Sequence, residues 1–495
     1  MTEEHDAPYD HPLVAVRLEK VEAMRDAGIE PYPVTFERTA TAVDLHERFG
    51  DLDSGTDTGE TVAVAGRLMN SRDIGALVFG VLQDGSGRIQ LFVEQERLGD
   101  RFEAFKDLDA GDWVGAHGEV VTTRRGELSV RVESFQLLAK ALRPLPEKWH
   151  GLADVEKRHR LRYVDLLVNE ESRRTMEARI ATVASLRDSL SRRGFVEVET
   201  PVLHNVPSGG LAHPFRTHHE ALGIDMFLRI ALELHLKRMI VGGVERVYEI
   251  GRVFRNEGVS PRHNPEFTML ELYEALADYE DMAALTEMLV VEAANRVAGT
   301  TELTYQDRPL SLSAPWRRIT YFGAIASATG DEWDPGMPLD EARRLSAQAG
   351  VETQDSWGVG KIAAEVFEAR VEPDLWEPTI VMDYPKEISP LAREHRSNPD
   401  LVERFEVIVA GSELANAFSE LNDPVEQRHR FEAQMEARAA GDTEAHPMDE
   451  DFLRALEYGM PPTGGMGLGI DRLVMLLTDQ ASIREVVLFP HLRPE

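Results

Sequence analysis

The residues best suited to chemistry stand close together at positions 254–267, which read FRNEGVSPRHNPEF. Residues two apart in an extended strand share a face, so Arg255 and Glu257 are predicted to point the same way. Glycine, proline and asparagine residues then predict a turn or loop, which carries Arg262 and His263 at its tip. Charged side chains grouped around one loop suit a core poorly and suit the binding of phosphates well.

The chain is predicted to return to extended structure at Phe267, which begins the second strand of the same hairpin. Phe267, Met269, Glu271 and Tyr273 alternate with other residues and therefore fall on one face of that strand. The hairpin then offers arginine for a phosphate, an aromatic ring for a base and carboxylates for a cation. This combination favours a nucleotide site over a solvated hairpin whose charges have no function.

Two further segments carry residues of the same kinds. Residues 466–472, MGLGIDR, predict a glycine-rich strand that leads into a helix, and Arg472 is the last residue of this motif. In residues 411–423, GSELANAFSELND, the side chains of Asn416, Phe418 and Glu420 alternate on one strand face. A strand without a function would be expected to carry either apolar or polar side chains on this face, and not a mixture of amide, aromatic and acidic ones. A polar pocket is therefore the better interpretation.

The elements that position these residues must belong to more than one domain. A chain of 495 residues with 42% hydrophobic residues can bury at least two cores, so two or three domains are expected. Apolar positions at helical spacing predict a helix within residues 13–30, and Gly, Asp, Ser and Thr predict a loop over 51–60. Between 61 and 140, several short β-like runs separated by turn signals predict a small barrel, with the OB-fold as the favoured type.

The fold class expected from these patterns is α+β and multidomain. We expect an N-terminal helical extension, an OB-fold β-barrel, a proline-bearing linker and a larger domain of mixed strands and helices, at residues 1–60, 61–140, 141–152 and 153–495. Within the larger domain, mostly helical insertions are expected around 280–380 and 426–441.

The composition bears on location and on partners. The chain has no run of about 18 apolar residues, so no membrane span is expected. Its acidic start argues against a signal peptide, and the absence of Cys suits a reducing compartment, so a cytoplasmic location is expected. The net charge of −33 fits either an acidic protein that keeps local basic patches for nucleic acid or adaptation to a high-salt cytoplasm.

The hairpin resembles motif 2 of class II aminoacyl-tRNA synthetases, and MGLGIDR resembles their motif 3. Residues 194–203, GFVEVETPVL, resemble motif 1, where a helix and a strand ending at Pro201 form the family's dimer interface. An N-terminal barrel narrows the resemblance to the subgroup for lysine, aspartate and asparagine. Within that subgroup, the chain resembles the lysyl-tRNA synthetase family over essentially its whole length. Glu233, Glu271 and Glu420 suit this family, because its substrate carries an extra cation.

The resemblance implies an OB-fold that binds the anticodon, followed by a class II catalytic domain built on an antiparallel sheet. It implies ATP-dependent activation of L-lysine to lysyl-adenylate and transfer of lysine to tRNA(Lys), with Arg255 and Arg472 as catalytic residues. The implied lysine-binding residues are Glu233, Glu257, Glu271, Tyr273, Asn416, Phe418 and Glu420. The implied ATP-binding residues are Arg255, Glu257, Arg262, His263, Asn264, Phe267 and Arg472. Glu406 and Glu413 match the positions that bind Mg²⁺ in this family.

In the barrel, the strands around residues 66–79 and 87–94 resemble those that read the anticodon. Phe79 is the expected stacking residue, and Arg72 and Gln90 are expected to add polar contacts, although each could instead be ordinary barrel structure. One departure from the family falls in residues 208–215, SGGLAHPF, where His213 stands in place of an arginine. The resemblance also implies a homodimer.

Two alternatives stay open at this point. The chain could be an aspartyl- or asparaginyl-tRNA synthetase, against which the glutamates at 233, 271 and 420 argue. It could also be a non-catalytic or tRNA-independent lysine-binding paralogue, against which the barrel and the intact Arg255, Glu413 and Arg472 argue.

Overall fold

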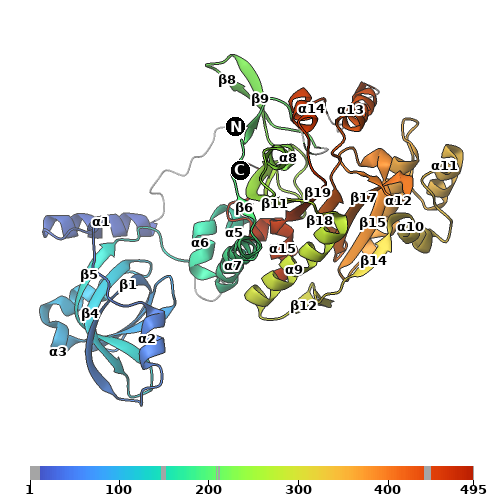
Figure 1. Ribbon diagram of the computed structural model, residues 1–495. Helices are drawn as coiled ribbons and strands as arrows, with labels where there is room; N and C mark the ends of the chain where they lie inside the picture. The colour runs from blue at the N-terminus through green and yellow to red at the C-terminus, as the bar shows by residue number, and fades with distance from the viewer. Residues whose placement is uncertain (1–11, 147–151, 208, 210–211, 440–446, 494–495) are drawn as a thin grey trace. The chain divides into compact units, whose positions relative to one another are not determined.

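The computed structural model describes residues 12–146, 152–207, 209, 212–439 and 447–493. The chain divides into two compact units, Met1–Leu152 and Ala153–Glu495 (Figure 1). In the described part of the chain, no helix is both long and apolar enough to cross a membrane.

The first unit is a closed five-stranded barrel with the strand order β1-β2-β3-β5-β4. The strands are β1 (Asp57–Asp73), β2 (Leu77–Gln83), β3 (Arg88–Glu94), β4 (Trp113–Thr122) and β5 (Leu128–Ala139). The helices of this unit are α1 (Pro12–Asp26), α2 (Ala42–Phe49), α3 (Gln95–Leu98), η1 (Gly99–Arg101) and α4 (Phe102–Lys106). All five β-like runs of the sequence are strands, and the predicted barrel is confirmed.

The loop predicted over residues 51–60 is shorter than expected, because β1 already begins at Asp57. Its first residues pair with β4, where Asp57 faces Val121, and the register then shifts before Thr61. The Thr58 hydroxyl also donates to the Val120 carbonyl at 2.7 Å. Polar residues that read as a loop therefore form a strand because β4 supplies their hydrogen-bond partners.

The second unit is built around a nine-stranded sheet, as far as the described residues show, in which β16 (Glu394–His395) pairs only with β17. The other strands, in spatial order, are β14 (Arg317–Thr320), β15 (Thr379–Pro385), β17 (Asn398–Val409), β18 (Ser412–Ser419), β19 (Thr463–Gly469), β11 (Glu266–Ala275), β10 (Arg246–Phe254) and β6 (Val196–Glu197). The pairs β14–β15 and β10–β6 are parallel, and the remaining pairs are antiparallel. Smaller sheets join β12 (Glu302–Tyr305) to β13 (Arg308–Ser311), and β7 (Leu203–His204) to β9 (Ile224–Leu228) and β8 (Arg216–His219).

Helices cover the sheet, and α7 and α9 pack against each other (Figure 1). The helices before and around the sheet are α5 (Val155–Arg160), α6 (Arg162–Val168), α7 (Glu170–Arg192), α8 (Glu233–Val241), α9 (Tyr279–Ala298), α15 (Ile470–Leu477) and α16 (Ile483–Val486). The segments where insertions were expected hold α10 (Tyr321–Thr329), α11 (Leu339–Gln348), α12 (Val359–Arg370), η2 (Glu372–Asp374) and α13 (Pro424–Ala439). Two further helices, η3 (Lys386–Ile388) and α14 (Glu450–Glu457), lie outside these segments. The segment around 280–380 is thus mostly helical, with β12, β13 and β14 inside it.

Strand alternation gives the sheet two different faces. The face toward α9 is apolar and includes Leu270 and Leu272 of β11, Ala415 and Ala417 of β18, and Met466 of β19, all in one core cluster. The intervening residues of the same strands point to the opposite face, where the functional side chains collect.

Two details of the motif segments differ from expectation. The strand predicted to end at Pro201 is short, because β6 covers only Val196–Glu197. The first strand of the hairpin, β10, ends at Phe254, so Arg255 and Glu257 lie in the loop beyond it rather than on a strand face. In residues 208–215, the segment that differs from the family pattern, Ser208, Gly210 and Leu211 lie outside the described residues.

Candidate active site

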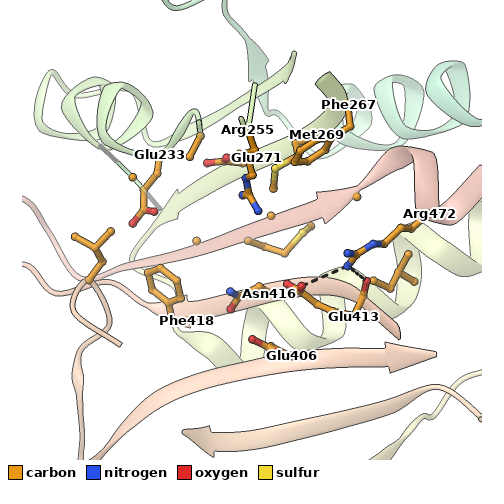
Figure 2. Close-up of a pocket in the computed structure, with 18 of the residues that line it drawn as sticks. Glu233, Arg255, Phe267, Met269, Glu271, Glu406, Glu413, Asn416, Phe418 and Arg472 are labelled. Atoms are coloured by element: carbon orange, nitrogen blue, oxygen red, sulfur yellow. Dashed lines mark hydrogen bonds and ion pairs between the residues drawn. The ribbon is translucent and has the colours of Figure 1, made fainter. Parts of the chain in front are cut away.

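One cavity of about 450 Å³ lies on the polar face of the sheet (Figure 2). Its lining includes every residue that the sequence assigned to lysine, ATP and Mg²⁺. These are Glu233, Arg255, Glu257, Arg262, His263, Asn264, Phe267, Glu271, Tyr273, Glu406, Glu413, Asn416, Phe418, Glu420 and Arg472. They come from α8, the hairpin of β10 and β11 with its loop, strands β17 and β18, the residue after β18, and the start of α15.

The strand registers place these side chains in rows across the sheet. In one row Glu271 lies opposite Gly467, Gly467 opposite Asn416, and Asn416 opposite Glu406. In the next row Tyr273, Gly465, Phe418 and Arg404 follow one another in the same way. Adjacent strands lie about 4.8 Å apart, so the two ends of each row are separated by about 14 Å.

Glycines form the middle of both rows, which leaves bare backbone as the floor of the cavity. A Cβ atom on Gly465 would lie 1.9 Å from Glu420 Oε1 and 2.6 Å from Tyr273 Cε1. A Cβ on Gly467 would meet the end of Met269 at 3.2 Å. Glycine is therefore needed along β19, at Gly465 above all, one residue before the string recognised in the sequence, because side chains from neighbouring segments occupy the space above it.

Three buried carboxylates define one end of the cavity. Glu233, Glu271 and Glu420 are 7%, 4% and 1% exposed, and they come from α8, β11 and the end of β18. Figure 2 shows Glu233 and Glu271 on one side and Phe418 on the strand that faces them. Glu271 accepts hydrogen bonds from the Leu232 N–H at 2.9 Å and from the hydroxyl of the buried Tyr273 at 3.3 Å.

Burial raises the pKa of Glu271 to about 7, and the charge of Glu233 adds to the rise. The pKa of Glu420 is raised well above its ordinary value by burial, against which the charge of Lys237 acts. Carboxylates in this state hold negative charge at a cost, and a bound cation would relieve it.

Sequence reasoning missed Lys237, which lies on α8 one turn after Glu233. Its ammonium group pairs with Glu233 Oε1 at 2.5 Å and also with Glu420, and its side chain is fully buried. The i,i+4 spacing of Glu233 and Lys237, which suits an ion pair on a helix, was the available signal. Apart from this ion pair, the described residues give the two Glu420 oxygens no well-aligned hydrogen bond.

The other end of the cavity carries arginines and an aromatic ring. The Arg255 guanidinium lies 5.1 Å from the centre of the Phe267 ring, and its Nε contacts the Ile230 carbonyl at 3.5 Å. Arg262 donates to the Gly411 carbonyl at 3.1 Å, and the ring of His263 bonds the Ser260 hydroxyl at 2.9 Å.

Asn264 is the most buried residue of the hairpin loop, at 4% exposure. Its amide donates to the Glu266 carbonyl at 2.6 Å, while its side-chain oxygen has no hydrogen-bond partner among the described residues. That pattern is consistent with a role in shaping the loop and with one acceptor left to meet a ligand.

Arg472 and the paired acids Glu406 and Glu413 close this end. Arg472 Nη1 donates to the Glu413 backbone carbonyl and lies 3.4 Å from Oε2 of the Glu413 side chain, as Figure 2 shows. Glu406 accepts from Arg404 Nη2 at 2.6 Å. Arg404 was not recognised in the sequence, although it stands two residues from Glu406 and so shares its strand face.

A magnesium ion fits the chemistry of this pair. The described residues contain no group of three or more His, Cys, Asp or Glu able to hold a metal alone. Burial, followed by the charge of Glu413, raises the pKa of Glu406 to about 7 in spite of Arg404. Two incompletely neutralised carboxylates suit a hard divalent cation that takes its remaining oxygen ligands from phosphates and water.

The barrel residues expected to meet the anticodon lie on three neighbouring strands. Arg72 of β1 pairs with Phe79 of β2, which stacks on Phe92 of β3 at 5.2 Å between ring centres and 5° between ring planes. Phe92 was not recognised in the sequence and widens the aromatic surface. Gln90 accepts a hydrogen bond from the Ser129 hydroxyl at 3.0 Å.

Comparison with known proteins gives the family. Residues 154–493 match the model for class II tRNA synthetases (D, K and N), and residues 62–138 match an OB-fold nucleic acid binding domain. The chain is 54% identical over 487 residues to a lysine–tRNA ligase of Moorella thermoacetica, covering 98% of this chain and 99% of that one. It is also 52% identical over 496 residues to a lysine–tRNA ligase of Nostoc punctiforme, covering 98% and 88%. An OB-fold followed by a class II domain, with this identity over nearly the full length, means that the chain belongs to the lysine–tRNA ligase family of class II tRNA synthetases.

Proposed function

We infer that this protein is a lysine–tRNA ligase, which activates L-lysine with ATP and charges tRNA(Lys). The observation that carries this function is the convergence of Glu233, Glu271 and Glu420, from three separate segments, on one end of a cavity that also holds Arg255 and Arg472. A buried group of carboxylates requires a cation, and the arginines at the other end offer positive charge for phosphates.

Lysine would bind with its amino groups toward the acidic end. We assign Glu233 and Glu257 to the α-ammonium, and Glu271, Tyr273 and Glu420 to the ε-ammonium. Asn416 and Phe418 shape the pocket between them. Support comes from burial: the residues assigned to the ε-ammonium are all buried, whereas Glu257 is exposed.

ATP would occupy the arginine end. Phe267 is assigned to stacking on adenine, and Arg262, His263 and Asn264 to the triphosphate and the adenine edge. Arg255 is placed to hold the lysine carboxylate together with the α-phosphate, and Arg472 to hold the far side of ATP. The Arg255 guanidinium lies 5.1 Å from the centre of the Phe267 ring, so both side chains border the space assigned to ATP.

The reaction needs alignment more than proton transfer. The lysine carboxylate is ionised near neutral pH, so it attacks the α-phosphorus without a general base, and pyrophosphate leaves. Arg255 and Arg472 supply positive charge for the transition state. Mg²⁺, held by Glu406 and Glu413, would neutralise phosphate charge when bound. The terminal ribose hydroxyl of tRNA then attacks the carbonyl of lysyl-adenylate, and AMP leaves.

The barrel supports the tRNA assignment. The rings of Phe79 and Phe92 lie parallel to each other, with Arg72 and Gln90 beside them. Together they present stacking surface and polar groups of the kind that bind unpaired bases. We assign these residues to the anticodon and place the protein in the cytoplasm.

A homodimer through the motif 1 region is also proposed. Apolar side chains are exposed there on α7 and the following segment, including Ile180 at 62% and Val196 at 53%. Exposed apolar groups gathered on one region are typical of a subunit interface.

ATP–pyrophosphate exchange tests the proposed function. Lysine should support exchange, and ornithine, one methylene shorter, should be about 10- to 200-fold poorer if packing alone discriminates. Leucine and methionine should be rejected more strongly, because they leave Glu271 and Glu420 without a partner. Exchange with aspartate or asparagine instead of lysine, or with none of these, would overturn the assignment.

A further inference from the structure

Lys237 is an unusual element of the acidic end of the cavity. Its side chain is 0% exposed, and the residues found to line the cavity do not include it. It nevertheless pairs with two residues that do line the cavity, Glu233 and Glu420, which belong to segments almost 190 positions apart. The ammonium therefore lies behind the wall and joins its two sides.

Two aromatic rings also lie near the side chain of Lys237. Its ammonium lies 5.4 Å from the centre of the Phe418 ring and 5.9 Å from that of Phe452. The Lys237 ammonium forms ion pairs with the carboxylates of Glu233 and Glu420, and Glu271 and Tyr273 of β11 belong to the same acidic cluster. In so dry a position an unpaired ammonium would be costly, so the two ion pairs hold it in one place.

The balance of charge at this end suggests what the ammonium does. Three buried carboxylates against one buried ammonium leave two negative charges, and a lysine zwitterion brings two ammonium groups. Without Lys237, a third negative charge would remain uncompensated in a closed site. Loss of Lys237 would raise the pKa of Glu420 further, because burial disfavours its charged form and the charge of Lys237 opposes that effect.

We propose that Lys237 is a positioning residue for lysine recognition, which fixes Glu233 and Glu420 in charge and direction from behind the cavity wall. The residue acts through these carboxylates and does not itself touch the substrate. This inference rests on the proposed function, since it takes the acidic end to be the site of the substrate ammonium groups.

Lys237→Met tests the inference, because it keeps an unbranched side chain and removes the charge. In ATP–pyrophosphate exchange, the KM for lysine should rise about 100-fold, while the KM for ATP changes by less than about threefold. The lysine KM of the variant should also fall more steeply than that of the wild type as the pH rises, since Glu420 must then lose its proton without help from Lys237.

Lys140→Met is a matched control from the barrel unit. Lys140 is also buried and paired with two acids, Asp109 and, at 2.7 Å, Asp112, but it lies in the other compact unit. Its loss should lower thermal stability and leave the lysine KM in exchange unchanged. Loss of stability without a change in lysine KM in Lys237→Met would match this control and overturn the inference.

If Lys237→Met does not fold, Lys237→Arg serves in its place, because the planar guanidinium keeps the charge but cannot reproduce the contacts of a compact ammonium. A raised lysine KM with an unchanged ATP KM supports the inference, and an unchanged lysine KM overturns it. The proposed function has a separate test: wild-type protein that fails to exchange with lysine refutes the function itself, whereas active wild type with an indifferent Lys237 variant refutes only the inference.

Discussion

Lysine binding should release a proton from Glu271, and lysine affinity should therefore depend on pH. Burial first, and then the charge of Glu233, raises the pKa of this carboxyl to about 7, while the Leu232 N–H, Tyr273 and Arg255 act in the opposite direction. A substrate ammonium at Glu271 requires the ionised form, so it must displace the proton. Free lysine keeps both amino groups charged below about pH 8, so at lower pH the group that titrates is on the enzyme and not on the substrate.

The size of the effect follows from the ionised fraction of Glu271. With a pKa of about 7 that fraction rises from about one tenth at pH 6 to about nine tenths at pH 8, so the Kd for lysine should fall about tenfold across this range. The number of protons released per lysine bound should be about 0.9 at pH 6 and about 0.5 at pH 7.

Isothermal titration of lysine in buffers of different ionisation enthalpy measures both quantities. In Glu271→Gln the affinity should be lower and the proton release from this group should be lost. A lysine Kd that does not change between pH 6 and 8, or proton release that persists in Glu271→Gln, would refute the reasoning. The contribution of Glu271 to folding stability changes with pH in the opposite direction to lysine affinity. A carboxyl whose pKa is raised on folding contributes stability that is present below its unfolded pKa near 4.5 and is lost as the pH rises through 7.

Three further variants separate the parts of the site. Glu420→Gln should weaken lysine use sharply, by about 100-fold in KM, and leave ATP binding near normal; equal loss of both would contradict the assigned role. Gly465→Ala should disrupt the lysine end, since its Cβ would lie 1.9 Å from Glu420 Oε1, whereas Gly467→Ala, with 3.2 Å to the flexible end of Met269, should lose less in the same exchange assay. Phe79→Ala should raise the KM for tRNA by about 5- to 150-fold and leave tRNA-independent exchange unchanged; impaired exchange would show that the ring supports structure instead.

The period of two along single strands made much of the site predictable. On β11, Phe267, Glu271 and Tyr273 face the cavity, as the alternation of the sequence required. The five strands of the barrel were likewise visible as short β-like runs between turns. In each case the signal is local, and burial on one side of a strand enforces it.

What the sequence did not reveal depends on contacts between distant segments. Lys237 sits in an apolar helical stretch and gains its meaning only when β18 brings Glu420 beside it. Arg404 bonds Glu406 on its own strand, but its contact with Asn416 requires the neighbouring strand β18. The early start of β1 likewise comes from pairing with β4, which no local pattern around Asp57 displays.

The accuracy of the site depends on the apolar face that lies behind it. Asn416 and Phe418 reach the cavity only because Ala415 and Ala417 of the same strand are buried in the core against α9. A slip of β18 by one residue would turn the alanines into the cavity and drive a polar amide into that core, at a cost that far exceeds any single contact in the site. The core therefore fixes the register, and the register fixes the row that sets Glu271 about 14 Å from Glu406. The distance between the acidic end and the arginine end of the cavity is thus decided by residues that lie in the core behind it.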